Sequence, residues 1–248
     1  MKKYCCILTN GIGDRMKVFE NYLKDHDPSE CDFYWLRNLY HSNYNPNKYF
    51  DIDVPLTIVN MTNHMTDNER SISDDIISKY NEKNIYDLKI PGYFTQVPPL
   101  FPKYFKLKKC VTQLVDDLEL TDCIGIHLRS YEAPKKFHKN AVTRSDELNN
   151  ILIKSATDIM TPDNRYFIAS DSQYILNYFK TWEKVTIIPT IYRNGYCNRN
   201  SEDAFYFDLC NLYALSQCKM IYRTYGGFAL LAGAWGSKPI HLLSEGFK

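Results

Sequence analysis

The sequence lacks a surplus of charge of either sign. Its 30 Lys and Arg residues nearly balance its 29 Asp and Glu residues, which leaves a formal net charge of +1. Proteins that bind nucleic acid or an anionic membrane surface usually present a strongly basic face. The charge balance therefore predicts that the protein has no nucleic-acid partner.

Long hydrophobic runs are absent as well. A helix that crosses a bilayer needs about 20 consecutive apolar residues, and no run in the 248 residues approaches that length. The short apolar run that follows the N-terminal lysines is too brief for a signal peptide and is more typical of a first β-strand. We therefore expect no signal peptide and no membrane span, and a cytoplasmic or otherwise soluble intracellular protein.

The cysteines lack metal-ligand spacing. There are eight of them, but they form no CxxC motif, and several lie inside apolar stretches, where cysteine acts as a small hydrophobic residue. This pattern favours free thiols in a reducing compartment and argues against a zinc site. Because no acidic cluster stands out as a metal site either, we expect the protein to use no metal.

The second half of the chain alternates strand-like and helix-like segments. The predicted strands are residues 123–129, 165–169, 184–188, 219–222 and 238–243, and the predicted helices are 143–160, 172–182, 201–217 and 226–235. The first of these strands carries no polar residue until its end, which is typical of a strand buried on both faces. Such alternation predicts an α/β fold with a doubly wound parallel sheet.

The first half is less regular. We expect strands near 3–8, 31–36 and 54–59, a tight loop at 10–13, helices at 14–24 and 105–120, a polar surface loop at 40–53, and an irregular proline-rich segment at 91–102. The pattern suggests two α/β lobes, residues 1–115 and 116–248, that meet at a ligand-binding cleft.

Polar residues follow the predicted strands at the ends where ligands bind in open α/β sheets. His127 and Arg129 end the first buried strand, and their spacing of two places both side chains on one face. The planar fork of an arginine suits a diphosphate. The alternative is an arginine paired with a carboxylate beside a hydrogen-bonded core histidine.

Two further clusters have the same position. Asp171 follows the next strand, although Ser172 could simply cap the following helix. The segment TYGGF places Thr224, Tyr225, Gly226, Gly227 and Phe228 before a helix, whose bare N-terminal amides can bind an anion. The loop NGIGDR at residues 10–15 has similar character but lacks the full GxGxxG spacing of a dinucleotide site.

Together, the segments NGIGDR, IGIHLR, FIASDS and TYGGFALLAGAW occur in an order that resembles the fucosyltransferase-like superfamily of glycosyltransferases. Asp208, followed by LSQC at residues 215–218, is similar to a helix of the α-1,6-type members. The resemblance covers the second half and the opening loop of the first. It implies a GT-B-like fold of two Rossmann-like lobes, an acceptor lobe at 1–115 and a nucleotide-sugar lobe at 116–248.

The resemblance also implies roles for individual residues. Arg129 would bind the β-phosphate of the donor, His127 would lie beside the nucleotide, and Asp208 would read the nucleobase. The other implied substrate-binding residues are Asn10, Gly11, Gly13, Asp14, Arg15, Asp171, Thr224, Tyr225, Gly226, Gly227 and Phe228. Many family members have a second arginine at the position of Ser130, a second acid at Ser172, and a serine pair at 226–227, so the sugar and the base stay open.

We therefore expect transfer of fucose from GDP-fucose to a glycan or glycoprotein acceptor, with inversion and without a metal or other cofactor. Fixed donors would stabilise the departing diphosphate, and Glu132, or else Asp14, would act as the general base. Three alternatives stay open. They are transfer of another sugar such as rhamnose or xylose, a non-catalytic nucleotide- or carbohydrate-binding protein, and an NAD-dependent oxidoreductase, which the incomplete glycine fingerprint disfavours.

Overall fold

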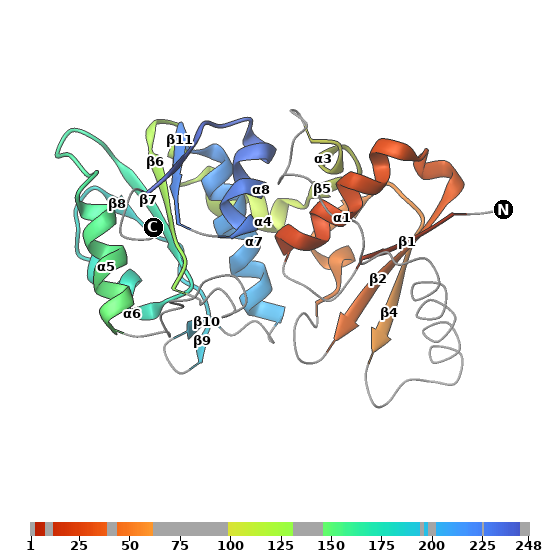
Figure 1. The fold of residues 1–248 in the computed structure, drawn as a ribbon, viewed down its shortest axis with the longest axis horizontal. Helices are drawn as coiled ribbons and strands as arrows, with labels where there is room; N and C mark the ends of the chain where they lie inside the picture. The colour runs from red at the N-terminus through yellow and green to blue at the C-terminus, as the bar shows by residue number, and fades with distance from the viewer. Residues whose placement is uncertain are drawn as a thin grey trace, which may run out of the picture. The chain divides into compact units, whose positions relative to one another are not determined.

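The computed structural model describes residues 3–7, 12–38, 44–61, 99–130, 146–193, 196–197, 202–224 and 226–243. The chain divides into two compact units (Figure 1): Met1–Cys110 with Arg199–Phe205, and Val111–Asn198 with Tyr206–Lys248. Helices α4 (Lys109–Asp116) and α7 (Glu202–Gln217) each contribute residues to both units. The predicted acceptor and nucleotide-sugar roles of two lobes, with a boundary at residue 115, stay predictions.

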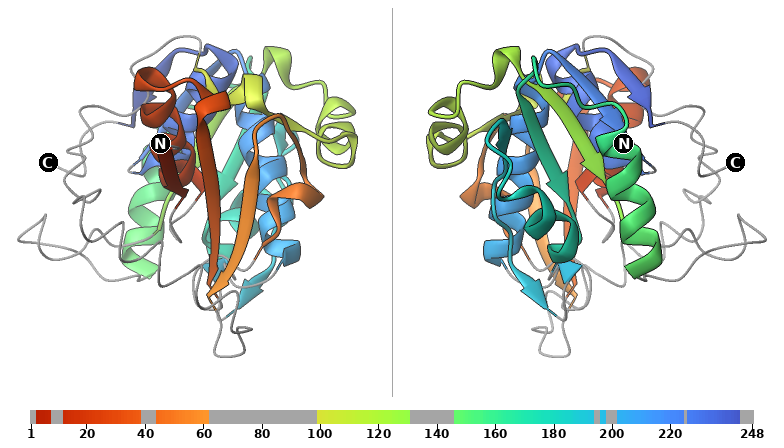
Figure 2. Two further views of the ribbon diagram at one scale, coloured as in Figure 1. Left: turned by 90° about the vertical axis from the view of Figure 1, so that its right-hand side faces the viewer. Right: turned by 90° about the vertical axis from the view of Figure 1, so that its left-hand side faces the viewer.

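The first unit contains a parallel three-stranded sheet in the order β1-β2-β4. Its strands are β1 (Lys3–Ile7), β2 (Cys31–Asn38) and β4 (Leu56–Met61), and the left view of Figure 2 looks onto this unit. Helix α1 (Ile12–Asp25) and the 3-10 turn η1 (Pro28–Glu30) connect the first two strands. A second, antiparallel sheet pairs β3 (Phe50–Ile52) with β5 (Phe105–Leu107), and the short elements η2 (Pro46–Lys48) and α3 (Phe101–Tyr104) precede these two strands.

The core of the first unit is built largely from aromatic rings. Met16, Phe19 and Leu23 share one buried face of α1, at the spacing typical of an amphipathic helix. The ring of Phe19 lies 5.1 Å from that of Phe33 on β2 and 4.7 Å from that of Phe105 on β5, measured between centroids. Burial of such large rings supplies much of the apolar area that stabilises a domain.

Three predictions for the first half were wrong. The expected polar loop at 40–53 includes η2 and β3 in its described part, with Tyr44, Tyr49 and Phe50 buried. The expected helix at 105–120 begins only at Lys109, because residues 105–107 instead pair with β3. Helix α1 starts at Ile12, so Gly13 lies in its first turn and not in the preceding loop.

The second unit contains the predicted doubly wound parallel sheet, which is thereby confirmed. Its strands are β6 (Ile124–Leu128), β7 (Tyr166–Ser170), β8 (Val185–Thr186), β11 (Met220–Arg223) and β12 (Ile240–Leu242), and every neighbouring pair is parallel. The spatial order is β12-β11-β6-β7-β8. Counted along the chain this is the order 3-2-1-4-5 typical of Rossmann folds, whose switch point lies between the first and fourth strands, here β6 and β11.

Helices cover both faces of this sheet. Helices α5 (Asp146–Thr157) and α6 (Gln173–Phe179) lie on the same side of the strands in the right view of Figure 2. Their side chains share one core cluster with Ile124, Ile126 and Leu128 of β6. On the opposite face, a Cβ atom on Gly125 would lie 3.0 Å from Leu215 Cδ2, at the end of α7. Odd-numbered residues of β6 therefore face α7.

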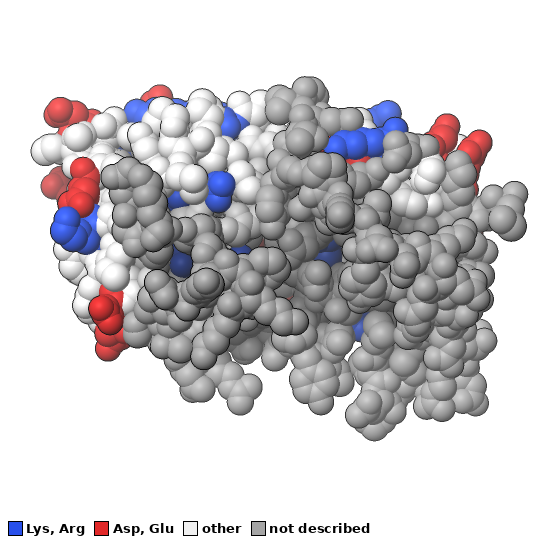
Figure 3. Space-filling view, viewed as in Figure 1, with Lys and Arg blue, Asp and Glu red and all other residues white. Residues whose placement is uncertain are grey.

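The remaining elements of the second unit are short, apart from α8 (Gly227–Gly236), which contacts β11 and β12. They are the 3-10 turn η4 (Leu120–Asp122) and the antiparallel pair β9 (Tyr192–Arg193) and β10 (Tyr196–Cys197). Among the residues that the structure describes, no helix has both the length and the hydropathy to cross a membrane. Side chains of both charge signs lie close together on the face drawn in Figure 3.

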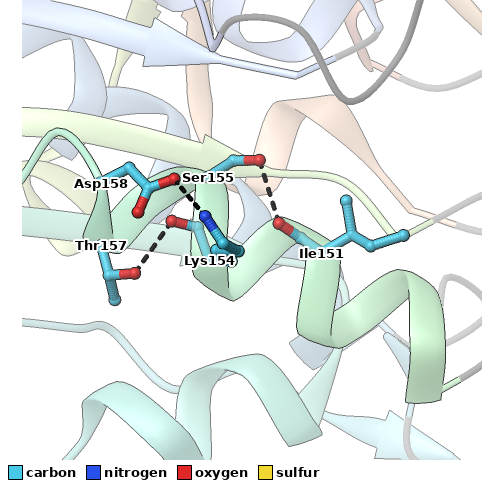
Figure 4. Close-up of polar contacts among 5 residues, drawn as sticks. All are labelled: Ile151, Lys154, Ser155, Thr157 and Asp158. Carbon is cyan, nitrogen blue, oxygen red and sulfur yellow. Dashed lines mark hydrogen bonds and ion pairs between the residues drawn. The ribbon is translucent and has the colours of Figure 1, made fainter.

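Helix α5 ends in local polar contacts, drawn in Figure 4. Lys154 Nζ lies 2.9 Å from Asp158 Oδ2, and the Thr157 hydroxyl donates to the carbonyl oxygen of Lys154 at 2.9 Å. The Ser155 hydroxyl donates to the carbonyl oxygen of Ile151 at 3.0 Å. An exposed ion pair of this kind contributes only about 0.3–0.5 kcal/mol to stability. These contacts therefore add little beyond local order at the end of the helix.

Candidate functional site

The candidate site lies where β6 and β11 end, at the switch point of the sheet. His127 of β6 is paired with Arg223 of β11, and the Thr224 N–H donates to the His127 carbonyl oxygen at 3.0 Å. The residues that follow the two strands therefore leave the sheet side by side. In doubly wound sheets the crevice beyond the carboxyl ends at this point is where ligands bind.

Arg129, which is half-buried, lies against Gly226. A Cβ atom on residue 226 would collide with Arg129 Nη1 and would lie 3.2 Å from its Cδ. Gly226 also has φ 102° and ψ 163°, a conformation that is essentially confined to glycine. The glycine thus supplies both the backbone turn before α8 and the space that the guanidinium occupies.

His127 lies against the same helix start. It is 6% exposed, and its imidazole stacks on the ring of Phe228 with the centroids 5.2 Å apart and the planes 25° apart. Phe228 belongs to the first turn of α8. The side chains of His127, near the end of β6, and of Arg129, directly after it, therefore both reach the beginning of α8, as their spacing of two predicts.

The start of α8 is suited to an anion. The residue at its N-cap is Gly226, which has no side chain to accept from the N–H groups of the first turn. These groups carry a partial positive charge, reinforced by the helix dipole. Arg129 adds a full positive charge at the same place, and its planar fork matches two oxygens of a phosphate. The arrangement can hold a phosphate or diphosphate group.

Asp171 and Thr224 lie beside Arg129 and contact the main chain there. The Thr224 side-chain oxygen accepts from the Arg129 N–H at 2.8 Å, and Asp171 Oδ1 accepts from the Ser130 N–H at 2.6 Å. Ser172 is the N-cap residue of α6, but its hydroxyl makes no capping hydrogen bond. Ser172 therefore has the predicted position of a helix cap, without a capping hydrogen bond from its side chain.

Three candidates of the opening loop, Gly13, Asp14 and Arg15, lie in the first unit, in the first turn of α1. Gly13 and Arg15 are buried there, and Asp14 is described only in its main chain. The Arg15 guanidinium carbon lies 4.6 Å from the Trp35 ring centroid and 5.1 Å from that of Tyr44, which makes two cation–π contacts. Arg15 is 1% exposed, so its side chain is held within the aromatic core of this unit.

Several of the predicted site residues stay untested in position or role. Asn10, Gly11, Glu132 and Tyr225 lie outside the described residues. Asp208 lies half-buried on α7, and its role in reading a nucleobase stays a prediction. Where side chains are described, no three of His, Cys, Asp and Glu come close enough to hold a metal ion.

One pair of residues at the site was missed by sequence reasoning. The hydroxyl of Ser130 donates to Asn149 Oδ1 at 2.8 Å, and the two residues are 0% and 1% exposed. Asn149 belongs to α5, and nothing in the local sequence distinguishes it from Asn150 beside it.

Comparisons with known proteins support the fold. No family model matches the sequence, and neither does any curated protein. Solved structures of NodZ alpha-1,6-fucosyltransferase do match, with a TM-score of 0.57. The one soaked with GDP-fucose is 14% identical and aligns 95% of this chain with 93% of that chain. The one co-crystallised with GDP is 16% identical, and the alignment covers 94% of this chain and 92% of the NodZ chain. This likeness confirms the predicted fucosyltransferase-like, GT-B-like α/β fold class.

Proposed function

We propose that the protein is a glycosyltransferase that transfers fucose from GDP-fucose to a glycan or glycoprotein acceptor. The observation that carries the proposal is the position of the Arg129 guanidinium at the uncapped start of α8. This position lies at the switch point between β6 and β11, where an anionic nucleotide is expected in such a sheet. A diphosphate there would meet one full positive charge and the dipole of a helix of 10 residues.

The fold supports the choice of donor. The NodZ structures that share this fold were soaked with GDP-fucose in one case and co-crystallised with GDP in the other. The motif order in the sequence points to the same family of enzymes. GDP-fucose is therefore the donor we propose, and fucose the sugar that is transferred.

The proposed reaction is an inverting displacement. An acceptor hydroxyl attacks the anomeric carbon of fucose on the face opposite GDP, while the bond from that carbon to the β-phosphate oxygen breaks. Charge on the β-phosphate grows as this bond breaks, so the fork of Arg129 and the amides of α8 bind the transition state more strongly than the ground state. The acceptor proton passes to a carboxylate, for which we propose Glu132, with Asp14 as the second candidate.

Metal independence is part of the proposal. A guanidinium and a helix N-terminus together can neutralise a leaving diphosphate in the way that a bound cation does in other enzymes. Transfer should therefore survive treatment with EDTA. Complete loss of transfer with EDTA, restored by Mn²⁺, would contradict this part of the proposal.

A ligand panel tests the function directly. Thermal unfolding would be followed with GDP, UDP, ADP, NAD and their sugar conjugates, where a ligand at 100 times its Kd stabilises by about 2.7 kcal/mol. GDP and GDP-fucose should raise Tm most. Release of GDP from GDP-fucose then separates an enzyme from a binding protein. Binding without any turnover would favour the non-catalytic alternative, and stabilisation by NAD alone would favour an oxidoreductase.

A further inference from the structure

The main chain that carries Arg129 leaves the sheet at a point where strand pairing has ended. The last pair between β6 and β7 is Leu128 with Ser170, and the last between β6 and β11 is His127 with Arg223. The peptide groups of residues 129 and 130 therefore have no ladder to hold them. The direction of the Arg129 side chain depends on whatever fixes these two groups.

Side chains of the residues that directly follow the two neighbouring strands perform this task. From the end of β11, the Thr224 oxygen accepts from the Arg129 N–H at 2.8 Å. Directly after β7, Asp171 Oδ1 accepts from the Ser130 N–H at 2.6 Å. The two acceptors thus hold consecutive N–H groups, one on each side of the Arg129 α-carbon. A carboxylate that accepts from an N–H forms one of the stronger hydrogen bonds in proteins.

Further hydrogen bonds hold Thr224 and Ser130 in place. The Thr224 hydroxyl donates to the His127 carbonyl oxygen at 3.4 Å, and the Thr224 N–H donates to the same oxygen at 3.0 Å. On the other side, the Ser130 hydroxyl donates to Asn149 Oδ1 on α5 at 2.8 Å. Ser130, Asn149 and Thr224 are all at most 3% exposed. Shielding from water strengthens such bonds and makes the loss of any partner costly.

We infer that Asp171, Thr224 and Asn149 are positioning residues, which aim the Arg129 guanidinium at the start of α8 by fixing the main chain on both sides of it. This differs from the resemblance, which would place Asp171 and Thr224 on the substrate. A carboxylate in contact with a diphosphate would repel it. In the positioning role, Asp171 contacts the Ser130 N–H and has no need to contact the diphosphate. The inference rests on the proposed function, in which Arg129 binds the β-phosphate.

The test compares GDP with GMP, which lacks the β-phosphate. Dissociation constants for both would be measured by calorimetry for the wild type, Arg129→Ala, Asp171→Ala and the double variant, with Tm recorded for each. Asp171→Ala should weaken GDP binding by about 10-fold, within the range of couplings seen in shared networks, and GMP binding by less than about 2-fold. The double variant should bind GDP no more weakly than Arg129→Ala alone.

Conservative and matched variants keep the test independent of folding. Asp171→Asn and Thr224→Ser each keep an acceptor oxygen and should recover most of the GDP affinity that Asp171→Ala and Thr224→Val lose. Asn149→Ala should also weaken GDP binding. The control is Asn150→Ala, at the position next to Asn149 on α5. Asn150 accepts an exposed hydrogen bond from the Tyr174 hydroxyl of α6, and its loss should leave GDP binding unchanged.

The outcomes separate the inference from the proposed function. If the wild type does not bind GDP, the proposed function is wrong and the inference falls with it. If the wild type binds GDP and Arg129→Ala weakens it, but the losses of Asp171→Ala and Arg129→Ala add, Asp171 contacts the ligand itself and the inference alone is wrong. Equal losses for GDP and GMP in Asp171→Ala would likewise overturn it.

Discussion

Gly226 lies so close to Arg129 that a Cβ atom added to the glycine would collide with Nη1 of the arginine. Glycine is also required by the main chain at this position, where φ is 102°. Gly226 thus allows the turn of the main chain into α8 and also leaves the space that the guanidinium occupies. Gly226 is therefore part of the arginine site as well as of the turn before α8.

The first prediction concerns Gly226→Ala. The added methyl group should displace the Arg129 guanidinium, and the unfavourable φ should lower the stability by about 1–3 kcal/mol. GDP binding should weaken more than GMP binding, because the displaced group is the one expected on the β-phosphate. Calorimetry with both nucleotides, together with urea unfolding, measures the two effects separately.

The matched control for this prediction is Gly125→Ala. Its added Cβ would lie 3.0 Å from Leu215 Cδ2, on the face of the sheet that α7 covers, and overpacking of this kind costs about 1–3 kcal/mol. The control should lower Tm but leave the ratio of GDP to GMP affinity as in the wild type. A Gly226→Ala variant with a wild-type ratio would show that the contact with Arg129 has no functional weight.

The second unit was largely predictable because its strands β6 and β7 are buried on both faces. A parallel strand covered by helices on two sides reads as a continuous apolar run, and Ile124 to Leu128 is buried throughout. The polar residues that interrupt such runs mark the ends of the strands. This is why His127, Arg129, Asp171 and Thr224 could be located at one edge of the sheet without any structure.

The first unit was less predictable because distant partners determine its local structure. Residues 105–107 form a strand only through pairing with β3, more than 50 residues earlier in the chain, and the local pattern favoured a helix. The same holds for Tyr44, whose ring stacks on that of Phe205 with centroids 3.2 Å apart. The surrounding sequence is polar and gives no sign of such contacts, so residues 40–53 were predicted to form a loop.

The second prediction concerns recognition of the base. Asp208 lies half-buried on α7, and a carboxylate can accept two N–H bonds from the edge of a guanine. Asp208→Asn replaces one acceptor oxygen with a donor, so it should weaken GDP binding much more than binding of inorganic pyrophosphate. Competition calorimetry with the two ligands measures this. Equal losses for both would assign Asp208 to the structure of the helix.

The third prediction concerns stability at alkaline pH. Burial, with a contribution from Cys123, raises the pKa of the Cys218 thiol from 9.0 to about 12. The folded state therefore keeps a proton that the unfolded state has lost between these two values. The contribution of the Cys218 thiol to the free energy of unfolding should be fully present below pH 9. It should be lost as pH rises toward 12, with a slope of up to about 1.4 kcal/mol per pH unit.

Cys218→Ala isolates this contribution. The variant is expected to be less stable at neutral pH, because it removes a fully buried side chain, but its stability should depend less on pH above 9. Urea unfolding at a series of pH values from 7 to the alkaline range, with the two curves subtracted, gives the contribution of the thiol. Parallel curves would show that the Cys218 proton does not affect alkaline stability.

The fourth prediction concerns Arg129 itself. Arg129→Lys keeps the positive charge but replaces a planar fork, which can bond two phosphate oxygens, with a single compact ammonium group. Because the contact should strengthen as the leaving group gains charge, kcat should fall by about 10²–10³, as is typical for loss of one such donor. Tm should stay close to that of the wild type.

A second arginine provides the control, and a structural role provides the rival explanation. Arg165 is exposed and donates to the carbonyl oxygens of Leu118 and Glu119, so Arg165→Lys should change neither kcat nor GDP affinity. If Arg129 were instead the buried partner of a structural carboxylate, Arg129→Ala would leave that carboxylate unpaired and cost roughly 3–5 kcal/mol of stability. Measuring Tm and fucose transfer for Arg129→Lys and Arg129→Ala separates the two roles. A variant that unfolds easily yet keeps wild-type turnover in its folded fraction would refute the catalytic one.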